Sequence, residues 1–328
     1  MNAYDFDKTI YKKDSTVSFY LFCIKKCPRC LKYLPIQAFG FIKYTFGFIG
    51  KTELKEKFFS FLKAIDDIDS LVSEYWEKNA ENIDSRYLEK QQPDDILISA
   101  SPEFLLAPIC QKLGISNLIA SEVDRKTGKF LSPNCYGREK VNRLLRSYRE
   151  EDIDCFYSDS QSDEPMARIS KQAYIVKEDK IIPWDSYKPS KLSVIKHAFL
   201  SAEFIAFLFI GIVNAINGVL FASLFSLLTN PNLAFIIGYL CSLTISYFLN
   251  TFLAFKERPG FLRYIKFCIS YIPNFLIQNG LVLLLYNKLG INYILVYALA
   301  VAIAVPITFL MLKFYAFAKK RKPSSKNK

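Results

Sequence analysis

Apolar and polar positions alternate in short blocks over the first 190 residues, and the chain then becomes almost continuously apolar. In the first part, short runs rich in β-branched and aromatic residues are separated by stretches with helical periodicity. We expect strands at Asn2–Tyr4, Asp95–Ala100, Asn117–Val123, Cys155–Asp159 and Ala173–Lys177. Strands that alternate with helices predict an α/β fold built on a mostly parallel sheet.

Beyond this half, four apolar blocks each reach the roughly 20 residues that a helix needs to cross a membrane. Acidic residues almost disappear, leaving Glu203 and Glu257. The pattern predicts an all-α transmembrane domain over residues 199–318, preceded by a linker at 188–198. The expected helices cover Phe199–Leu228, Leu233–Phe255, Phe267–Tyr286 and Ile291–Leu312.

The membrane half repeats itself. Asn214 and Asn274 hold corresponding places in the first and third helices, each of which starts a helical pair, and Phe252–Phe255 and Phe314–Phe317 end the second and fourth. Nearly equal offsets predict two helical hairpins duplicated in the same orientation.

The formal net charge of +12 fits a nucleic-acid partner or a membrane surface. The basic residues decide between them, because they gather before the first membrane helix, between the second and third, and after the fourth, up to a basic tail at 319–328. Lys288 alone lies on the other side. The positive-inside rule therefore predicts a multi-pass protein of the inner cell membrane, with both termini and the first domain cytoplasmic and no nucleic acid bound.

Polar side chains with phosphate chemistry end several of the expected strands. Asp5 and Asp7 lie one residue apart in the motif DFDKT, and an extended stretch would point both to one side. One carboxylate can then attack phosphorus while the other transfers protons.

Later motifs supply the remaining parts of a phosphate site. The hydroxyl of Ser99 can hydrogen-bond a phosphate oxygen. Lys140 lies near the start of a helix and supplies a cation for a phosphate dianion. Asp159 and Asp163 follow another strand, and carboxylate oxygens of this kind suit Mg²⁺.

Taken in order, the motifs DFDKT, ISAS, REK and SDSQSD resemble those of the haloacid dehalogenase-like phosphatases, near their phosphoserine phosphatase branch. This resemblance implies a Rossmann-like domain over 1–187 with an inserted helical cap at about 15–92. It also implies a role for each motif residue. Asp5 would be nucleophile and metal ligand, Asp7 acid/base and a metal ligand through its carbonyl, Thr9, Ser99 and Lys140 phosphate-binding residues, and Asp159 and Asp163 further Mg²⁺ ligands.

The membrane half resembles the GtrA-like four-helix proteins, on the segment around Asn214 and on YFLNTFLAFKE, which contains Asn250. That family is associated with polysaccharide synthesis and with moving polyprenyl-phosphate-linked sugars. Asn214, Asn250 and Asn274 are then polar candidates at membrane depth. Most such residues are expected to hydrogen-bond between helices, and a minority to line a headgroup path.

Together the halves predict a phosphomonoesterase anchored in the bilayer, whose substrate is a membrane lipid phosphate. A polyprenyl-linked phosphosugar is favoured, and a phosphatidylglycerophosphate is the alternative. A third hypothesis is a lipid-linked sugar transporter whose phosphatase half regulates it. Whether the protein forms a homo-oligomer stays an open question.

Two local features have alternative interpretations. Val17–Gly50 is apolar but interrupted by lysines, and it is either a cap helix packed on the catalytic domain or a helix lying in the membrane interface. Ser101 either contacts substrate or caps the helix that begins near Pro102, and the capping role is favoured.

Overall fold

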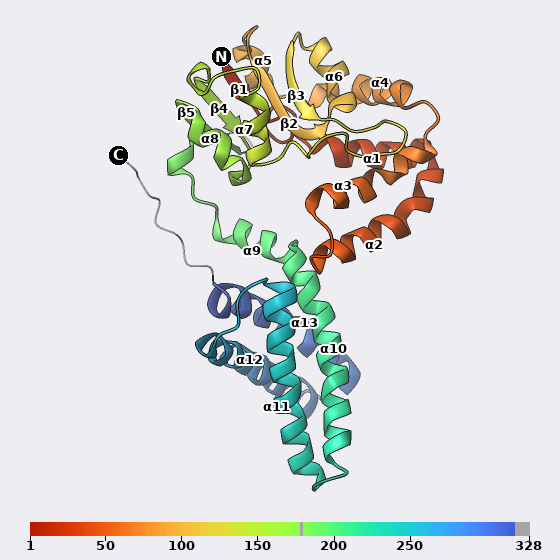
Figure 1. Ribbon diagram of the computed structural model, residues 1–328. Coiled ribbons are helices and arrows are strands. Elements are labelled where there is room, and N and C mark those ends of the chain that lie inside the picture. Colours follow the sequence, from red (N-terminus) through yellow and green to blue (C-terminus); the bar gives the residue numbers. More distant parts are fainter. Residues whose placement is uncertain (178–179, 319–328) are drawn as a thin grey trace. The chain divides into compact units, whose positions relative to one another are not determined.

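The computed structural model describes residues 1–177 and 180–318, which form two compact units (Figure 1). The first unit comprises Met1–Tyr44 and Ile49–Lys188, and the second comprises Thr45–Phe48 and the chain from Pro189 onward. The basic tail expected at 319–328 lies outside the described residues.

The first unit is built on a six-stranded sheet with the order β3-β2-β1-β4-β5-β6. Neighbouring strands are parallel except for the antiparallel pair β5 and β6. All five expected strands are confirmed, and β6 was missed because its four residues end in proline and are largely exposed. The strands are β1 (Asn2–Tyr4), β2 (Ile96–Pro102), β3 (Asn117–Ser121), β4 (Cys155–Ser158), β5 (Gln172–Lys177) and β6 (Lys180–Pro183).

Strand β1 has three residues, yet it lies in the centre of the sheet. Ala3 pairs with Ile96 on one side and with Phe156 on the other, and all three side chains are fully buried. The backbone N–H of Asp5 continues the ladder by donating to the carbonyl of Tyr157 at 2.8 Å. Pairing with strands on both sides of β1 therefore fixes the position of Asp5.

Helices occupy most of the long segment between β1 and β2, as expected for an inserted cap. Side-chain caps start three of them, since Asp14 accepts from the N–H of Val17, Asp67 from that of Ser70 and Asp84 from that of Arg86. Trp76 in α4 donates to the carbonyl of Leu105 in α6 at 2.6 Å, which ties the insertion to the core. The helices of this unit are α1 (Ser15–Lys26), α2 (Leu34–Thr45), α3 (Lys51–Phe59), α4 (Ile68–Asn79), α5 (Ser85–Lys90), α6 (Glu103–Lys112), α7 (Arg138–Leu144) and α8 (Glu164–Ile169).

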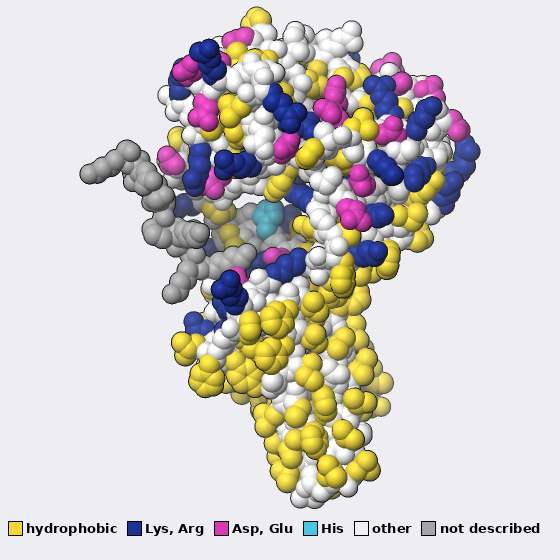
Figure 2. All heavy atoms as spheres, viewed as in Figure 1, with side chains coloured by type: hydrophobic (Ala, Val, Ile, Leu, Met, Phe, Trp, Pro, Cys, Tyr) yellow, Lys and Arg dark blue, Asp and Glu magenta, His cyan; other side chains and the backbone are white. Residues whose placement is uncertain are grey.

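The second unit begins with a short helix, α9 (Lys191–Phe199), and contains four helices long and apolar enough to span a membrane. Figure 2 shows their outward side chains as largely hydrophobic, as contact with lipid requires. The four expected spans are thus confirmed. They are α10 (Ala202–Phe225), α11 (Pro231–Leu249), α12 (Phe261–Leu281) and α13 (Tyr293–Met311), the last three extended by π-helical segments at Asn250–Ala254, Val282–Lys288 and Leu312–Ala316.

The start of the third span differs most from the expectation, because the helix begins at Phe261 and not at Phe267. Arg263 and Lys266 were placed between the second and third spans, but they lie in the first two turns of α12. Long basic side chains can extend from a helix end toward the headgroups, so the helix begins earlier than its apolar block. Arg263 also pairs with Glu257 at 3.3 Å.

The predicted repeat has a structural counterpart. The second and fourth spans both end in a π-helical turn, closed by bonds from the N–H of Phe255 to Asn250 and from that of Phe317 to Leu312. The rings of Phe255 and Phe317 stack with centroids 4.3 Å apart and an interplanar angle of 8°. Residues in equivalent positions of the two hairpins therefore meet in the core of this unit.

The three asparagines at membrane depth differ in their bonding. Asn214 accepts from the hydroxyl of Ser242 at 2.7 Å, which links α10 to α11 as expected. Asn250, which is fully buried, donates to Ser246 in its own helix. Asn274 accepts from Gln278, also within one helix. The expectation that most of these bonds cross between helices is therefore wrong for Asn250 and Asn274, because each bonds to a partner one turn away in its own helix. The buried Oδ1 of Asn250 has no hydrogen-bond partner within residues 1–177 and 180–318.

Candidate active site

The carboxyl ends of β1, β2 and β4 lie side by side, since β1 pairs with β2 on one edge and with β4 on the other. Asp5 and Asp7 follow β1, Ser99 lies in β2, and Asp159 follows β4. In open parallel sheets this edge is where ligands bind. The topology thus brings four of the sequence-predicted residues to one place.

Lys140, from the first turns of α7, is the centre of the site. Its ammonium lies 2.7 Å from Oδ1 of Asp5 and 2.8 Å from Oδ2 of Asp163. Ser158, the last residue of β4, donates to the same Asp163 oxygen at 2.8 Å. Lys140, Asp163 and Ser158 are almost completely buried. Two carboxylates therefore share one ammonium in a nearly dry environment.

Burial and the unequal charges in this cluster together shift the pKa values of Lys140 and Asp5. Burial disfavours the charged form of Lys140, but the carboxylates of Asp5 and Asp163 outweigh it and raise its pKa. Burial also raises the pKa of Asp5, and the neighbouring ammonium opposes the rise. One cation facing two carboxylates leaves negative charge uncompensated.

Asp7 has a separate set of partners. Its carboxylate accepts from the N–H of Ser15, the first residue of α1, at 2.7 Å and from the hydroxyl of Ser101 at 2.6 Å. Burial raises the pKa of Asp7 and the charge of Asp14 adds to this, while the two serines oppose it. The expected extended geometry is wrong, because β1 ends at Tyr4 and the chain turns at Phe6.

The three hydroxyl residues Ser99, Ser101 and Thr9 differ in what they contact. Ser99 is buried and accepts from the N–H of Ser101. Ser101 does not cap α6, whose N-cap is Pro102, and instead holds Asp7. The expectation of a capping serine is therefore wrong: strand β2 runs on to Pro102, so Ser101 still lies on the sheet edge that faces Asp7. Thr9 is buried, and its hydroxyl has no hydrogen-bond partner within residues 1–177 and 180–318.

Lys55 is a residue that sequence reasoning missed. It projects from α3, in the inserted segment, and donates to the carbonyl of Ala100 at 2.7 Å and to Asn134 at 3.0 Å. Burial lowers the pKa of Lys55 to about 8, with a smaller contribution from the charge of Lys51. Within the sequence KTELKEKFF it looks like one more lysine on a solvated helix face, so no local signal could have identified it.

The residues here fit a magnesium ion by chemistry rather than as a ready-made cage. Asp5, Asp159 and Asp163 offer hard oxygen ligands, and their negative charge exceeds that of the buried cation. Within the described ranges no three His, Cys, Asp or Glu side chains already stand together as a metal cluster. Mg²⁺ does not need one, because it retains waters and binds through one or two carboxylates plus substrate phosphate.

Aspartates at the ends of parallel strands, held by a buried lysine, form a site suited to phosphate chemistry, and the same chain carries four helices long and apolar enough to span a membrane. The chain belongs to the haloacid dehalogenase-like hydrolases, which it matches over residues 3–168. Residues 206–317 match the GtrA/DPMS transmembrane domain. Both resemblances seen in the sequence are confirmed, as is the expected enzyme class.

Individual relatives are more distant. A histidinol-phosphatase of Neisseria meningitidis serogroup C (strain 8013) is 29% identical over 101 residues, covering 26% of this chain and 44% of that protein. The chain therefore spans less than half the length of this relative. Among solved structures, a Bordetella pertussis Tohama I protein of unknown function is 18% identical with a TM-score of 0.45, covering 53% of this chain and 87% of the other. A phosphoserine phosphohydrolase-like protein of Francisella tularensis subsp. tularensis SCHU S4 is 16% identical with a TM-score of 0.35, covering 53% and 86%.

Proposed function

We propose that the protein is a membrane-bound, Mg²⁺-dependent phosphomonoesterase that acts on a lipid-linked phosphate. The observation that carries the proposal is the union, in one chain, of a hydrolase site centred on Asp5 and Lys140 with a GtrA/DPMS transmembrane domain. A freely soluble phosphate ester would need no such anchor on its enzyme.

In the proposed reaction an oxygen of Asp5 attacks phosphorus, and the bond from phosphorus to the leaving oxygen breaks. Asp7 gives its proton to that oxygen, and its raised pKa favours the protonated form that this step needs. Asp7 then takes a proton from water, which attacks the aspartyl-phosphate and releases inorganic phosphate. Lys140 and the hydroxyl of Ser99 hold the transferring phosphoryl group throughout.

Asp5, Asp159, Asp163 and the backbone carbonyl of Asp7 would hold the magnesium ion. When bound, it neutralises charge on the phosphoryl oxygens. The surplus of buried carboxylates over ammonium at this site supports the assignment.

The substrate is proposed to be a polyprenyl-linked phosphosugar of the cell envelope, dephosphorylated at the inner leaflet and passed to the membrane unit. The basic residues before α10, between α11 and α12, and after α13 favour a cytoplasmic site. The loop between α10 and α11 carries no charge. The match to the GtrA/DPMS domain supports the choice of lipid.

Turnover in proteoliposomes tests the proposal. Phosphate release should depend on Mg²⁺, disappear in Asp5→Asn, and be at least about tenfold faster on a lipid-linked phosphosugar than on its water-soluble headgroup. Equal rates on the two would refute the lipid assignment.

Two alternatives are separated by product analysis. Mass spectrometry of mixed liposomes would reveal a phosphatidylglycerophosphate phosphatase by release of phosphate from that lipid in preference to the phosphosugar. A transporter with a regulatory phosphatase half would continue to move lipid at full rate in the Asp5→Asn protein.

A further inference from the structure

A second charged pocket lies beside the Asp5–Lys140 cluster. It has a volume of about 440 Å³, within the range of small-molecule sites and more room than one phosphoryl group needs. Asp159, at the end of β4, forms part of its wall. Four cationic side chains line the pocket against two carboxylates: Lys8, Lys12, Arg86 and Lys177 against Asp84 and Asp159.

Two of these cations already bond to oxygen atoms of the protein. Arg86 grips the carboxylate of Asp84 through two bonds, and Lys177 donates to the backbone carbonyl of Asp159. Lys8 and Lys12 are exposed at the mouth, and neither ammonium makes a hydrogen bond or ion pair inside the described ranges. The charges of Lys8 and Lys12 act on Asp159 and Asp84, respectively, without a direct ion pair, so both ammonium groups can still contact an anionic ligand.

The backbone at Lys8 is strained, which is unusual for a residue that only covers the surface. Its φ is 59°, in the left-handed region that favours glycine. Bonds from its N–H to the carbonyls of Tyr11 at 2.6 Å and Lys13 at 3.2 Å hold this conformation. Strain of this kind gathers at ligand sites.

Thr9 gives a second, independent sign that this pocket binds a ligand. It lines the same pocket, is 6% exposed, and its hydroxyl has no partner among the residues that the structure describes. A buried hydroxyl without a hydrogen bond is costly, and a ligand oxygen would relieve it.

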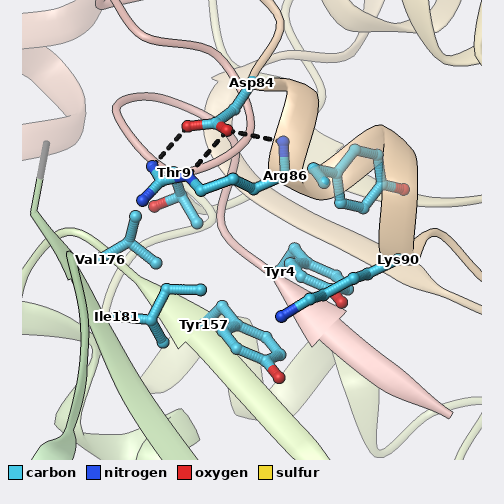
Figure 3. A pocket seen from close by; sticks show the side chains of 9 residues that line it. Tyr4, Thr9, Asp84, Arg86, Lys90, Tyr157, Val176 and Ile181 are labelled. Carbon is cyan, nitrogen blue, oxygen red and sulfur yellow. Dashed lines mark hydrogen bonds and ion pairs between the residues drawn. The ribbon is translucent and has the colours of Figure 1, made fainter. Parts of the chain in front are cut away.

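The pocket continues into a narrower aromatic slot, with which it shares Thr9, Asp84, Arg86 and Val176. Figure 3 shows Arg86 stretched above Thr9, with Tyr4, Tyr157 and Lys90 farther along the slot. The slot holds about 40 Å³, enough for water but not for a lipid chain. The slot therefore has no room for an acyl or prenyl chain, and of the two spaces the larger pocket is the one that could hold a polar group.

We propose that the pocket binds a second phosphate group of the substrate, covalently joined to the phosphomonoester that Asp5 attacks. Lys8 and Lys12 would supply the charge, and the hydroxyl of Thr9 a hydrogen bond. The inference rests on the proposed function and narrows its substrate class. A lipid-linked phosphosugar and a phosphatidylglycerophosphate both carry one phosphomonoester and one phosphodiester a short distance apart.

Binding to the full-length Asp5→Asn protein in detergent micelles with Mg²⁺ tests this independently of turnover. Calorimetry would compare glucose 6-phosphate with glucose 1,6-bisphosphate, and glycerol 3-phosphate with glycerol 1,3-bisphosphate. Each bisphosphate should bind at least about tenfold more tightly, as expected for a charge-assisted contact. Inorganic phosphate added to the monophosphates should not reproduce the gain.

A second substitution assigns the gain to the pocket. Lys12→Gln in the same background should reduce the preference to about threefold or less. Lys13→Gln removes an equal charge from the neighbouring residue, which does not line the pocket, and should leave the preference intact. Equal affinities within each pair, or equal losses in the two variants, would overturn the inference. Failure of the wild-type protein to release phosphate would instead refute the phosphatase and leave the affinity ratio to decide this site.

Discussion

Lys140 connects three distant parts of the chain through two ion pairs. It belongs to α7 and meets Asp5 after β1 and Asp163 after β4. Buried ion pairs add little to stability by themselves, but removing one partner leaves an uncompensated buried charge. The same ammonium that positions the carboxylates is therefore also what makes their burial tolerable.

We expect Lys140→Met to destabilise the first unit by about 3–5 kcal/mol and to lower kcat/KM by at least about 10²-fold, as loss of a charge-stabilising donor does. Thermal unfolding followed by near-ultraviolet circular dichroism and phosphate release would measure the two effects. Lys171→Met is the matched control, because Lys171 pairs with Asp154 on the exposed surface. Equal melting temperatures for the two variants would contradict this account of the cluster.

Lys55 predicts a pH dependence with a definite sign. Because its pKa is lowered to about 8, it is charged below that pH and neutral above it. Lys55 donates to the carbonyl of Ala100, the residue after Ser99, and we propose that its charge also attracts the phosphate ester. That attraction would be present below pH 8 and lost as the pH rises further. The KM of the wild-type protein should increase above pH 8, and Lys55→Met should have a high KM that stays flat from pH 6 to 9. A KM in Lys55→Met that still rises through pH 8 would assign the titration to another group.

Regular elements were the most predictable part of the molecule. The five main strands and the four spans follow from the hydrophobic pattern, because the apolar residues that define each element lie in one continuous segment of the chain. The partners of Asp7 and Lys55 were not predictable, since they come from α1, β2 and a loop through tertiary contacts of high sequence separation. Spacing could order the motifs, but it could not show that Asp5 and Asp7 face different neighbours.

The interpretation of Val17–Gly50 remained open from the sequence, and within this segment the surface of α2 favours an interfacial position. Leu34, Ile36, Phe39, Phe41 and Ile42 are all exposed, and Lys32 and Lys43 flank them. Apolar side chains bordered by lysines are typical of helices that lie among lipid headgroups.

We therefore expect brominated lipid to quench the fluorescence of the new tryptophan in the Phe39→Trp protein reconstituted into liposomes. Tryptophan at position 88 is the control, because Leu88 is similarly exposed but lies on α5. The fluorescence of the two native tryptophans should be measured in unsubstituted protein and subtracted. The same weak quenching at positions 39 and 88 would mean that α2 packs without touching lipid.

For the whole molecule, the two units suggest a division of labour. The first unit carries the carboxylates and cations of phosphate chemistry. The second unit carries two related hairpins joined through Phe255 and Phe317. The union of the two units in one chain is the basis of our proposal that the substrate is an anionic headgroup on a lipid that stays in the bilayer.

Lipid extraction from source cells in which the chromosomal copy carries Asp5→Asn tests this account most directly. Mass spectrometry should show accumulation of a lipid that bears a phosphomonoester, with a matching loss of its dephosphorylated form. Reintroducing the wild-type chain should reverse both changes. A lipid profile identical to that of wild-type cells, with accumulation only of water-soluble phosphate esters, would contradict the central claim that the substrate is a membrane lipid.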